Sequence, residues 1–561
     1  MTPTTLQIDP PHDATLEYID TLPNALKSTF SLADISPEIR AKLTLTLPGR
    51  VLQHQLNALP RSLSLASVQK NWVLIGGTGT GKAYYMGGLI HELRRNGIDD
   101  PNDTVLVVTK ASIVIQTYRV LVQEFGLKNI QVVSYDSLRS SLGEMYITWK
   151  TQIINDSPRV NPVWCKKEDS GISRILCDEC QALKNDDSFA SQIIQNAGIA
   201  GYPITFLSAT PFSRVAHVKT IGMCLAPIVK IGNAKFRLDH NSFPQWIKSI
   251  TDNPNEWTPA DMKRVCKAFE DQLIRFENVR FAHMFKIRQI VIPFESPEHK
   301  QIYDAAFAEY QTARLEQGRD ALTGFAAVLV ALRKFNQKAE LLRASYLAKS
   351  AYQCVNSKKR PVNAIIACGF LDTIFVVEQC LVKKYGVDPS LIAIIKGGQS
   401  AKERQYNIDR FNSEKARYII LSFGAGGAGL SLHHTKNKKY PSEIFLPPVW
   451  NSEDLVQVLG RAHRINSEST TYQNLIWFAG TMEENIAERV KGKCAALKEV
   501  VGANERWVMA MDNSNELRSS TQVNISQLRD ADTEDDDAPV SEELLAACNG
   551  NANASVHQLI T

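Results

Sequence analysis

Short apolar runs alternate along the chain with longer segments whose apolar residues recur at helical spacing. The runs lie at 72–75, 105–108, 131–135, 175–177 and 204–207 in the first half, and at 364–367, 392–395, 418–421 and 443–446 in the second. Nearly continuous apolar strands that alternate with helices are typical of parallel sheets covered on both faces. The pattern predicts an α/β protein with two parallel-sheet domains, in which ligands bind beyond the carboxyl ends of the strands.

The pattern changes between and outside these two blocks, which divides the chain into five parts. We predict a partly ordered lead-in over 1–45, a first α/β domain over 46–215, a mainly helical region over 216–355, a second α/β domain over 356–512 and a disordered polar and acidic tail over 513–561. Residues 211–360 hold 24 Lys and Arg against 14 Asp and Glu, an excess of ten. This excess forms either a basic surface for a polyanion or the solvated faces of helices.

Composition excludes few classes of function. A chain of 561 residues with 44% hydrophobic and 22% charged residues is typical of a globular protein of two to four domains. The net charge of +4 says little about partners. The sequence shows no secretory leader and no apolar run long enough to span a bilayer, so we expect an intracellular protein.

Ten cysteines are scattered along the chain without a framework. Cys177 and Cys180 have the C-x-x-C spacing of a zinc site, but no second pair lies near them in the sequence. We therefore expect reduced thiols rather than a metal site.

The strongest chemical signal follows the first apolar run. A glycine-rich turn separates the run 72–75 from a helical pattern over 83–93, and it consists of Gly76, Gly77, Thr78, Gly79, Thr80 and Gly81, followed by Lys82 and Ala83. Glycines let backbone N–H groups approach phosphates, and the helix N-terminus presents unpaired donors to the same anion. This context predicts a phosphate-binding loop whose lysine reaches the β- and γ-phosphates.

The last position of the loop departs from the G-x-x-x-x-G-K-[ST] pattern. Ala83 has no hydroxyl group and cannot supply the usual Mg²⁺ ligand. Water can take that place because Mg²⁺ commonly keeps several waters. Nucleotide binding is therefore expected, and turnover is the open question.

An acidic pair and a polar turn follow two later strands. Asp178 and Glu179 end the run 175–177, and Ser208, Ala209 and Thr210 end the run 204–207. One carboxylate at a strand end can hold Mg²⁺ while the next polarises the water that attacks the γ-phosphate. An acidic pair alone is common, so its weight comes from the phosphate loop upstream.

Two further polar features accompany the loop. Gln55 precedes it closely enough to hydrogen-bond an adenine ring, although a polar residue on a helix surface has the same spacing. In the second half, Arg461 and Arg464 lie three apart on a predicted helix and hence on one face. Arginine can stabilise charge on a transferring phosphoryl group, but an isolated pair is commonly a surface feature.

Taken in order, these motifs resemble those of the superfamily 2 helicase-like ATPases, and within them the Swi/Snf-like family of DNA translocases. Residues 178–185 resemble the family's D-E-x-H-x-x-K-N box, and residues 207–211 resemble motif III. In the second half, residues 426–432 resemble motif V, and residues 457–465 match the Q-x-x-G-R-A-H-R-I form of motif VI. Residues 481–486 resemble the segment that follows motif VI. The resemblance covers roughly residues 52–493. The A-L-K-N ending and the R-A-H-R form are its most family-specific parts.

The resemblance implies two RecA-like lobes with ATP bound in the cleft between them. It implies that Lys82 and the loop amides bind phosphates, that Asp178 holds Mg²⁺ and that Glu179 is the catalytic base. Gln55 would contact adenine, and Arg461 and Arg464 would contact the γ-phosphate, with Gly429 and Gln457 nearby. The residues that would couple the site to movement of the lobes are Gln181, Ser208, Ala209 and Thr210. Double-stranded DNA would lie across both lobes, held mainly by its phosphates, in the nucleus or another DNA-containing compartment.

Three functions follow from this interpretation. The leading one is an ATP-dependent double-stranded DNA translocase. The second is a nucleotide-binding scaffold with weak or no turnover, because Ala83 replaces the loop hydroxyl. The third is an RNA-acting member of the same superfamily, which the box and motif VI disfavour. Gln181 also replaces the histidine of the family's box, and its amide can still hydrogen-bond.

Overall fold

The computed structural model describes most of the chain between residues 51 and 501. The described residues are 51–139, 145–154, 157–165, 167–231, 234–254, 258–277, 279, 281, 283, 285–316, 321–426, 430–448, 452–483 and 499–501. The predicted lead-in and acidic tail, and Gly429 of motif V, lie outside the described residues. The chain divides into two compact units, which we name lobe 1 (1–280 with 492–512) and lobe 2 (281–491 with 513–561).

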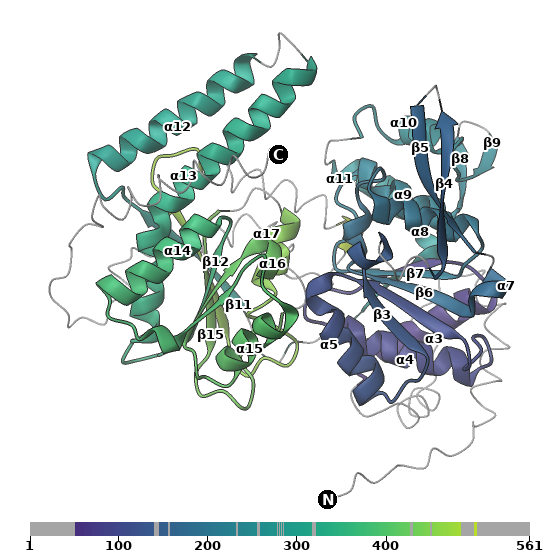
Figure 1. The fold of residues 1–561 in the computed structure, drawn as a ribbon, viewed down its shortest axis with the longest axis horizontal. Coiled ribbons are helices and arrows are strands. Elements are labelled where there is room, and N and C mark those ends of the chain that lie inside the picture. Colours follow the sequence, from purple (N-terminus) through teal and green to yellow (C-terminus); the bar gives the residue numbers. More distant parts are fainter. Residues whose placement is uncertain are drawn as a thin grey trace, which may run out of the picture. The chain divides into compact units, whose positions relative to one another are not determined.

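Lobe 1 contains a six-stranded sheet with the order β10-β1-β7-β6-β2-β3, in which every neighbouring pair is parallel (Figure 1). Its strands are β1 (Trp72–Ile75), β2 (Thr104–Thr109), β3 (Ile130–Ser134), β6 (Ile172–Asp178), β7 (Ile204–Ser208) and β10 (Leu273–Arg275). All four residues of β1 are fully buried, as expected of an apolar strand covered on both faces.

Helices and two small hairpins complete lobe 1. The helices are α3 (Gln53–Ser67), α4 (Lys82–Arg95), α5 (Val114–Tyr118), α7 (Lys167–Ser170), α8 (Phe189–Ile199), α9 (Lys219–Leu225), α10 (Phe243–Ile250) and α11 (Pro259–Ala268). The hairpins pair β4 (Ile147–Ile154) with β5 (Ser157–Trp164), and β8 (Ile228–Ile231) with β9 (Ala234–Arg237). Leucines 59 and 63 of α3 and Leu89 of α4 belong to one apolar core with β1, so these helices fix the start of the phosphate loop.

Lobe 2 contains a second six-stranded parallel sheet, with the order β11-β16-β15-β12-β14-β13. Its strands are β11 (Phe285–Ile292), β12 (Asn363–Cys368), β13 (Ile392–Ile395), β14 (Tyr418–Ser422), β15 (Ser442–Leu446) and β16 (Thr471–Phe478). Its helices are α12 (Pro297–Glu316), α13 (Ala321–Val355), α14 (Leu371–Gln379), α15 (Ala401–Asn412), α16 (Phe423–Gly426) and α17 (Ser452–Leu459). The predicted fold class, two lobes each built on a parallel sheet, is confirmed.

The region 216–355, predicted as a mainly helical part of its own, is divided between the lobes. Strand β10 joins the sheet of lobe 1, and strand β11 joins the sheet of lobe 2. Helices α12 and α13 lie side by side in lobe 2, where Tyr303 and Phe335 pack into the core of that lobe (Figure 1). Polar residues alternate with apolar ones in β11, so a search for continuous apolar runs does not predict this strand.

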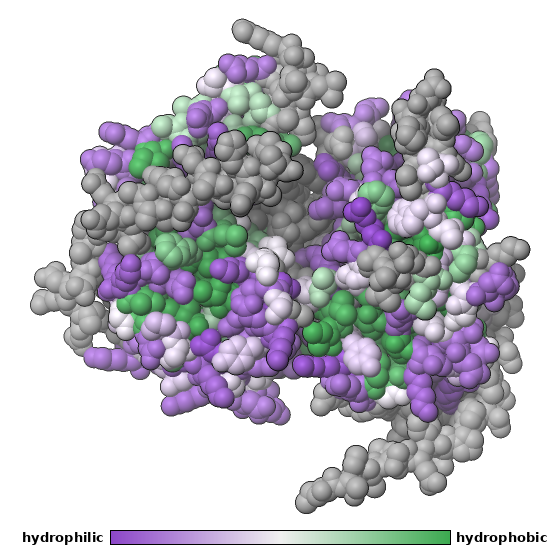
Figure 2. All heavy atoms as spheres, viewed as in Figure 1, coloured by the Kyte–Doolittle hydropathy of each residue, from purple (hydrophilic) through white to green (hydrophobic). Residues whose placement is uncertain are grey.

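The surface of each lobe is mixed in character. Figure 2 shows polar residues over most of the visible face, with smaller apolar patches among them. Several large apolar side chains are exposed, among them Ile115 and Tyr118 in lobe 1 and Leu371 and Phe375 in lobe 2. No described helix combines the length and the apolar composition needed to cross a bilayer.

Helix α13 is anchored to the sheet of lobe 2 by a buried carboxyl group. Glu340 Oε1 accepts hydrogen bonds from the main-chain N–H groups of Gly369 (2.7 Å) and Phe370 (3.1 Å), just before α14. Burial raises the pKa of Glu340 to about 7, although Thr373, Arg343 and these two amides act in the opposite direction.

This pKa predicts how the Glu340→Gln substitution changes stability with pH. Folded protein keeps a proton that unfolded protein releases, so the free energy of unfolding falls as pH rises from 4.5 to about 7. Glutamine still accepts both amide bonds and does not titrate. The free energy of unfolding of the variant, relative to that of the wild type, should therefore rise by roughly 1.4 kcal/mol per pH unit in this window. Urea unfolding at several pH values measures it. A difference that is independent of pH would contradict this account.

Candidate active site

The phosphate loop is built by β1, six loop residues and α4. Gly81 has φ +80° and stands at the N-cap of α4, and Gly79 has φ +72°. These left-handed conformations favour glycine and turn the loop toward the N-terminus of α4. The buried Thr80 hydroxyl donates to the Gly77 carbonyl (2.7 Å), which closes the loop on itself.

Helix α3 supports the loop from outside. The fully buried Gln55 Nε2 donates to the carbonyls of Thr80 (2.8 Å) and Gly81 (2.9 Å), and its Oε1 accepts from Leu52 N–H (2.9 Å). The His54 ring also hydrogen-bonds the Thr80 carbonyl, at 2.9 Å. The structure thus places Gln55 as a brace of the loop, and its predicted contact with adenine stays a prediction.

An aromatic ring packs against the start of the loop. A Cβ atom on Gly76 would lie 2.6 Å from the Phe276 ring, so only glycine fits there. The same ring makes an edge contact with His54 at 4.9 Å between centroids. Sequence analysis missed His54 and Phe276. His54 could have been predicted as a neighbour of the loop because it is adjacent to Gln55 in the sequence. No feature of the sequence predicts the contact of Phe276 with Gly76, because the two residues lie 200 positions apart.

Ala83 is the second residue of α4 and packs against the apolar core of lobe 1. The position that carries a hydroxyl in the usual loop therefore contributes an apolar contact instead. Any metal ion at the phosphates must take its protein ligands from elsewhere.

The acidic pair lies at the carboxyl end of β6, in the same sheet as β1. Asp178 is nearly fully buried, and its Oδ2 accepts from the Thr109 hydroxyl (3.2 Å). Burial and the neighbouring Glu179 carboxylate raise the pKa of Asp178 to about 6, although Lys82, the Glu179 amide and Thr109 oppose the shift.

The second oxygen of Asp178 indicates a ligand. Within the described part of the chain, Oδ1 is buried and has no hydrogen-bond partner. Mg²⁺ is commonly bound by one or two carboxylates together with phosphates and water. The residues present therefore fit a magnesium ion, and no described group of three or more His, Cys, Asp or Glu side chains offers another metal site.

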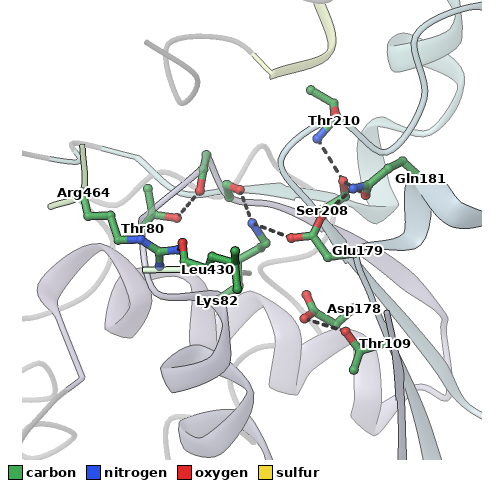
Figure 3. A network of polar contacts seen from close by, with 12 residues as sticks. Thr80, Lys82, Thr109, Asp178, Glu179, Gln181, Ser208, Thr210, Leu430 and Arg464 are labelled. Carbon is green, nitrogen blue, oxygen red and sulfur yellow. Dashed lines mark hydrogen bonds and ion pairs between the residues drawn. The ribbon is translucent and has the colours of Figure 1, made fainter. Parts of the chain in front are cut away.

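A line of polar contacts connects the loop lysine with motif III (Figure 3). Lys82 Nζ lies 3.9 Å from Glu179 Oε1, and Glu179 Oε2 accepts from Gln181 Nε2. Gln181 Oε1 in turn accepts from the Ser208 hydroxyl (2.5 Å), whose oxygen accepts from Thr210 N–H (2.9 Å). These groups come from the ends of three segments far apart in the sequence.

Glu179 itself has a strained backbone. Its φ of +52° is left-handed, a conformation that is uncommon for residues other than glycine and that is found at functional sites. This conformation places Glu179 toward Lys82 while Asp178 remains in the strand.

In lobe 2, the predicted helix that carries both arginines is wrong in its extent. Helix α17 ends at Leu459, and Arg461 and Arg464 lie in the turn and loop beyond it, so they do not share a helix face. Arg464 Nη2 instead donates to the Leu430 carbonyl (2.6 Å), and Arg461 O accepts from Leu432 N–H (3.2 Å). Gln457 lies on α17 and is buried, as is Arg461. The spacing of the two arginines predicts a helix, and the structure has a turn from Gly460 onward in its place.

Two family models match the chain. Residues 49–213 match the model described as the res subunit of type III restriction enzymes, and residues 345–466 match the helicase conserved C-terminal domain. The first range contains the phosphate loop and the acidic pair, and the second contains motifs V and VI.

Curated relatives include one protein that matches most of this chain and others that match shorter parts of it. A mimivirus protein described as an ATP-dependent RNA helicase (Acanthamoeba polyphaga mimivirus) is 22% identical over 83% of this chain and 86% of its own length. The TATA-binding protein-associated factor MOT1 of Saccharomyces cerevisiae is 30% identical over 27% of this chain, and the human DNA repair and recombination protein RAD54-like is 28% identical over 23%.

These matches support the resemblance to the Swi/Snf-like family of superfamily 2 helicase-like ATPases. The chain spans only 8% of the length of MOT1 and 17% of that of the human RAD54-like protein. The Sulfolobus solfataricus SWI2/SNF2 ATPase core in complex with double-stranded DNA matches with a TM-score of 0.33 and 14% identity, over 84% of this chain and 97% of that one.

Glycine at position 81 should be essential to the phosphate loop. A Cβ atom there would lie 2.6 Å from Gln55 Nε2 in addition to straining the backbone. We expect Gly81→Ala to weaken ATP binding at least about tenfold, which corresponds to about 1.4 kcal/mol, in equilibrium titrations. Gly97→Ala is the matched control, because Gly97 has φ +65° with nothing within 4 Å. Equal affinities of the two variants would contradict the bracing role of Gln55.

The raised pKa of Asp178 predicts a pH dependence of metal binding. Protonated Asp178 cannot ligate Mg²⁺, so the Mg²⁺-dependent part of nucleotide affinity should fall as pH drops through about 6. Asp178→Asn should abolish that part at every pH. A Mg²⁺ dependence that is the same in the variant would remove Asp178 from the metal site.

Proposed function

We propose that this chain is an ATP-dependent double-stranded DNA translocase of Swi/Snf type. The observation that carries the proposal is the continuous line of contacts from Lys82 through Glu179 and Gln181 to Ser208. This line joins Lys82, which can bind phosphate, to Glu179, which can accept a proton. It also joins both to the segment of Ser208, whose position can change when the γ-phosphate is bound or lost. Family membership supports ATP hydrolysis at the level of the family.

The proposed chemistry assigns one task to each group of lobe 1. Lys82 exchanges its contact with Glu179 for the phosphates of ATP, and the amides at the N-terminus of α4 bind the same anion. Glu179 accepts a proton from the water that attacks the γ-phosphorus, while the bond to the β–γ bridging oxygen breaks. Asp178 would hold Mg²⁺, which when bound neutralises phosphate charge.

The arginines of lobe 2 complete the proposed mechanism. Arg461 and Arg464 would stabilise the charge that develops on the transferred phosphoryl group, and Gln457 and Gly429 are the further residues of lobe 2 that we assign to ATP binding. Gln181, Ser208, Ala209 and Thr210 link the presence of the γ-phosphate to movement of the lobes. Repeated cycles move the protein along duplex DNA, which it holds mainly by phosphates, in a DNA-containing compartment.

The decisive experiment compares ATP hydrolysis with duplex DNA, single-stranded DNA and RNA in a salt series. Duplex DNA should stimulate hydrolysis most, and the stimulation should weaken as salt rises because phosphate contacts release counterions. Stimulation by RNA but not by duplex DNA would favour an RNA-acting helicase, the activity in the description of the mimivirus relative.

The scaffold alternative rests on Ala83, whose side chain is an apolar contact of the core. A rate no higher than that of the Lys82→Ala variant, with Mg²⁺ and duplex DNA present, would favour a nucleotide-binding protein that does not turn over.

Substitution of either of two residues should abolish hydrolysis without unfolding lobe 1. Lys82→Ala removes the phosphate contact, and Glu179→Gln removes the proton acceptor, so we expect a loss of at least about a hundredfold in kcat for the second variant. Glu168→Gln, at an exposed position, is the matched control. Full activity of a folded Glu179→Gln protein would exclude Glu179 as the base.

A further inference from the structure

The end of motif V and the residue after it, in lobe 2, have an irregular backbone that depends on side chains. Residues 430–433 belong to neither a helix nor a strand, and each of their carbonyl groups accepts a hydrogen bond from a side chain. The donors are Arg464 for Leu430 (2.6 Å), Asn412 for Ser431 (3.1 Å) and Lys438 for both Leu432 (3.1 Å) and His433 (2.9 Å). Irregular backbone can be buried only when such partners satisfy it.

Lys438 provides half of these four contacts. Its side chain is buried, with 5% of its surface exposed, and its Nζ also lies 4.8 Å from the centre of the Phe411 ring. The main chain of the same residue closes the loop, because Lys438 N–H donates to the Thr435 carbonyl and the His434 ring contacts the Lys438 carbonyl.

A buried ammonium group is costly, which distinguishes Lys438 from its neighbours. Burial lowers the pKa of Lys438 to about 7, and the carboxylate of Glu414 offsets only part of this effect. Lys436 and Lys439, in the same loop, are exposed. A lysine that served only solubility would remain exposed, so the burial of Lys438 indicates a structural role for its ammonium group.

The segment that Lys438 holds is bound to both arginines of motif VI. Leu430 O contacts the Arg464 side chain, and Leu432 N–H donates to the Arg461 carbonyl. The Arg464 guanidinium group and the main chain of Arg461 are thus bound to the backbone of residues 430–433, and Lys438 holds that backbone through two of its carbonyl groups.

We propose that Lys438 is a positioning residue, which fixes the backbone of residues 430–433 and through it holds Arg461 and Arg464 in the geometry needed for ATP hydrolysis. This inference rests on the proposed function. Lys438 does not touch the nucleotide in this account, so its loss should affect the chemical step and leave nucleotide binding by lobe 1 intact.

The test compares Lys438→Met with Lys436→Met in DNA-stimulated ATP hydrolysis by the full chain. Methionine keeps the length and apolar stem of lysine and removes the donors. We expect Lys438→Met to lower kcat at least about tenfold, with KM for ATP within about twofold of the wild type. Hydrogen exchange should show faster exchange of the Leu432 amide in this variant alone.

The outcomes separate the positioning role from the proposed function. A wild-type protein without hydrolysis would overturn both, whereas an active wild type with equal kcat in the two variants would overturn only the role of Lys438. Equal losses in kcat and in nucleotide affinity would also overturn it. If Lys438→Met does not fold, Asn412→Ala decides, because it removes a side-chain donor to the carbonyl of Ser431 in the same segment: a lowered kcat at constant KM supports the proposal, and an unchanged kcat contradicts it.

Discussion

The ammonium group of Lys82 lies between a loop suited to phosphate and a pair of adjacent carboxylates, and lobe 1 is arranged around that contact. Burial disfavours the charged form of Asp178, and the adjacent Glu179 carboxylate repels it, so both effects raise the pKa of Asp178. Lys82 relieves part of that repulsion at 3.9 Å from Glu179. A triphosphate that arrives with a cation would satisfy the lysine and both acids together.

The two lobes position their polar groups by different means. In lobe 1, glycines with left-handed backbone, the N-terminus of α4 and the brace from Gln55 shape the loop. In lobe 2, an irregular backbone segment is held by side-chain donors, and the arginines of motif VI are bound to it. Gly81 and Lys438 therefore have comparable roles. Gly81 shapes the phosphate loop through its backbone conformation, and Lys438 holds residues 430–433 through its buried ammonium group.

Much of the fold could be predicted from the sequence because most strands of both sheets are short apolar runs buried on two faces. Strands β11 and β16 escaped this criterion because polar residues interrupt them, as in Phe285–Ile292, and β10 is only three residues long. The phosphate loop and the acidic pair could be predicted because their chemistry is local in sequence. The helix extending to Arg464 was wrong, since tertiary contacts to Leu430 and Leu432 replace helical hydrogen bonds there. Phe276 and Lys438 act through contacts that no local pattern encodes.

We propose that groups of both lobes act on one nucleotide. This proposal is tested most directly by the distance between a label on lobe 1 and a label on lobe 2, at exposed positions such as Lys128 and Lys402, measured with and without ATP. The account predicts that ATP brings the labels closer in the wild type and fails to do so after Lys82→Ala or Arg464→Ala. An unchanged distance in a wild-type protein that hydrolyses ATP would contradict it.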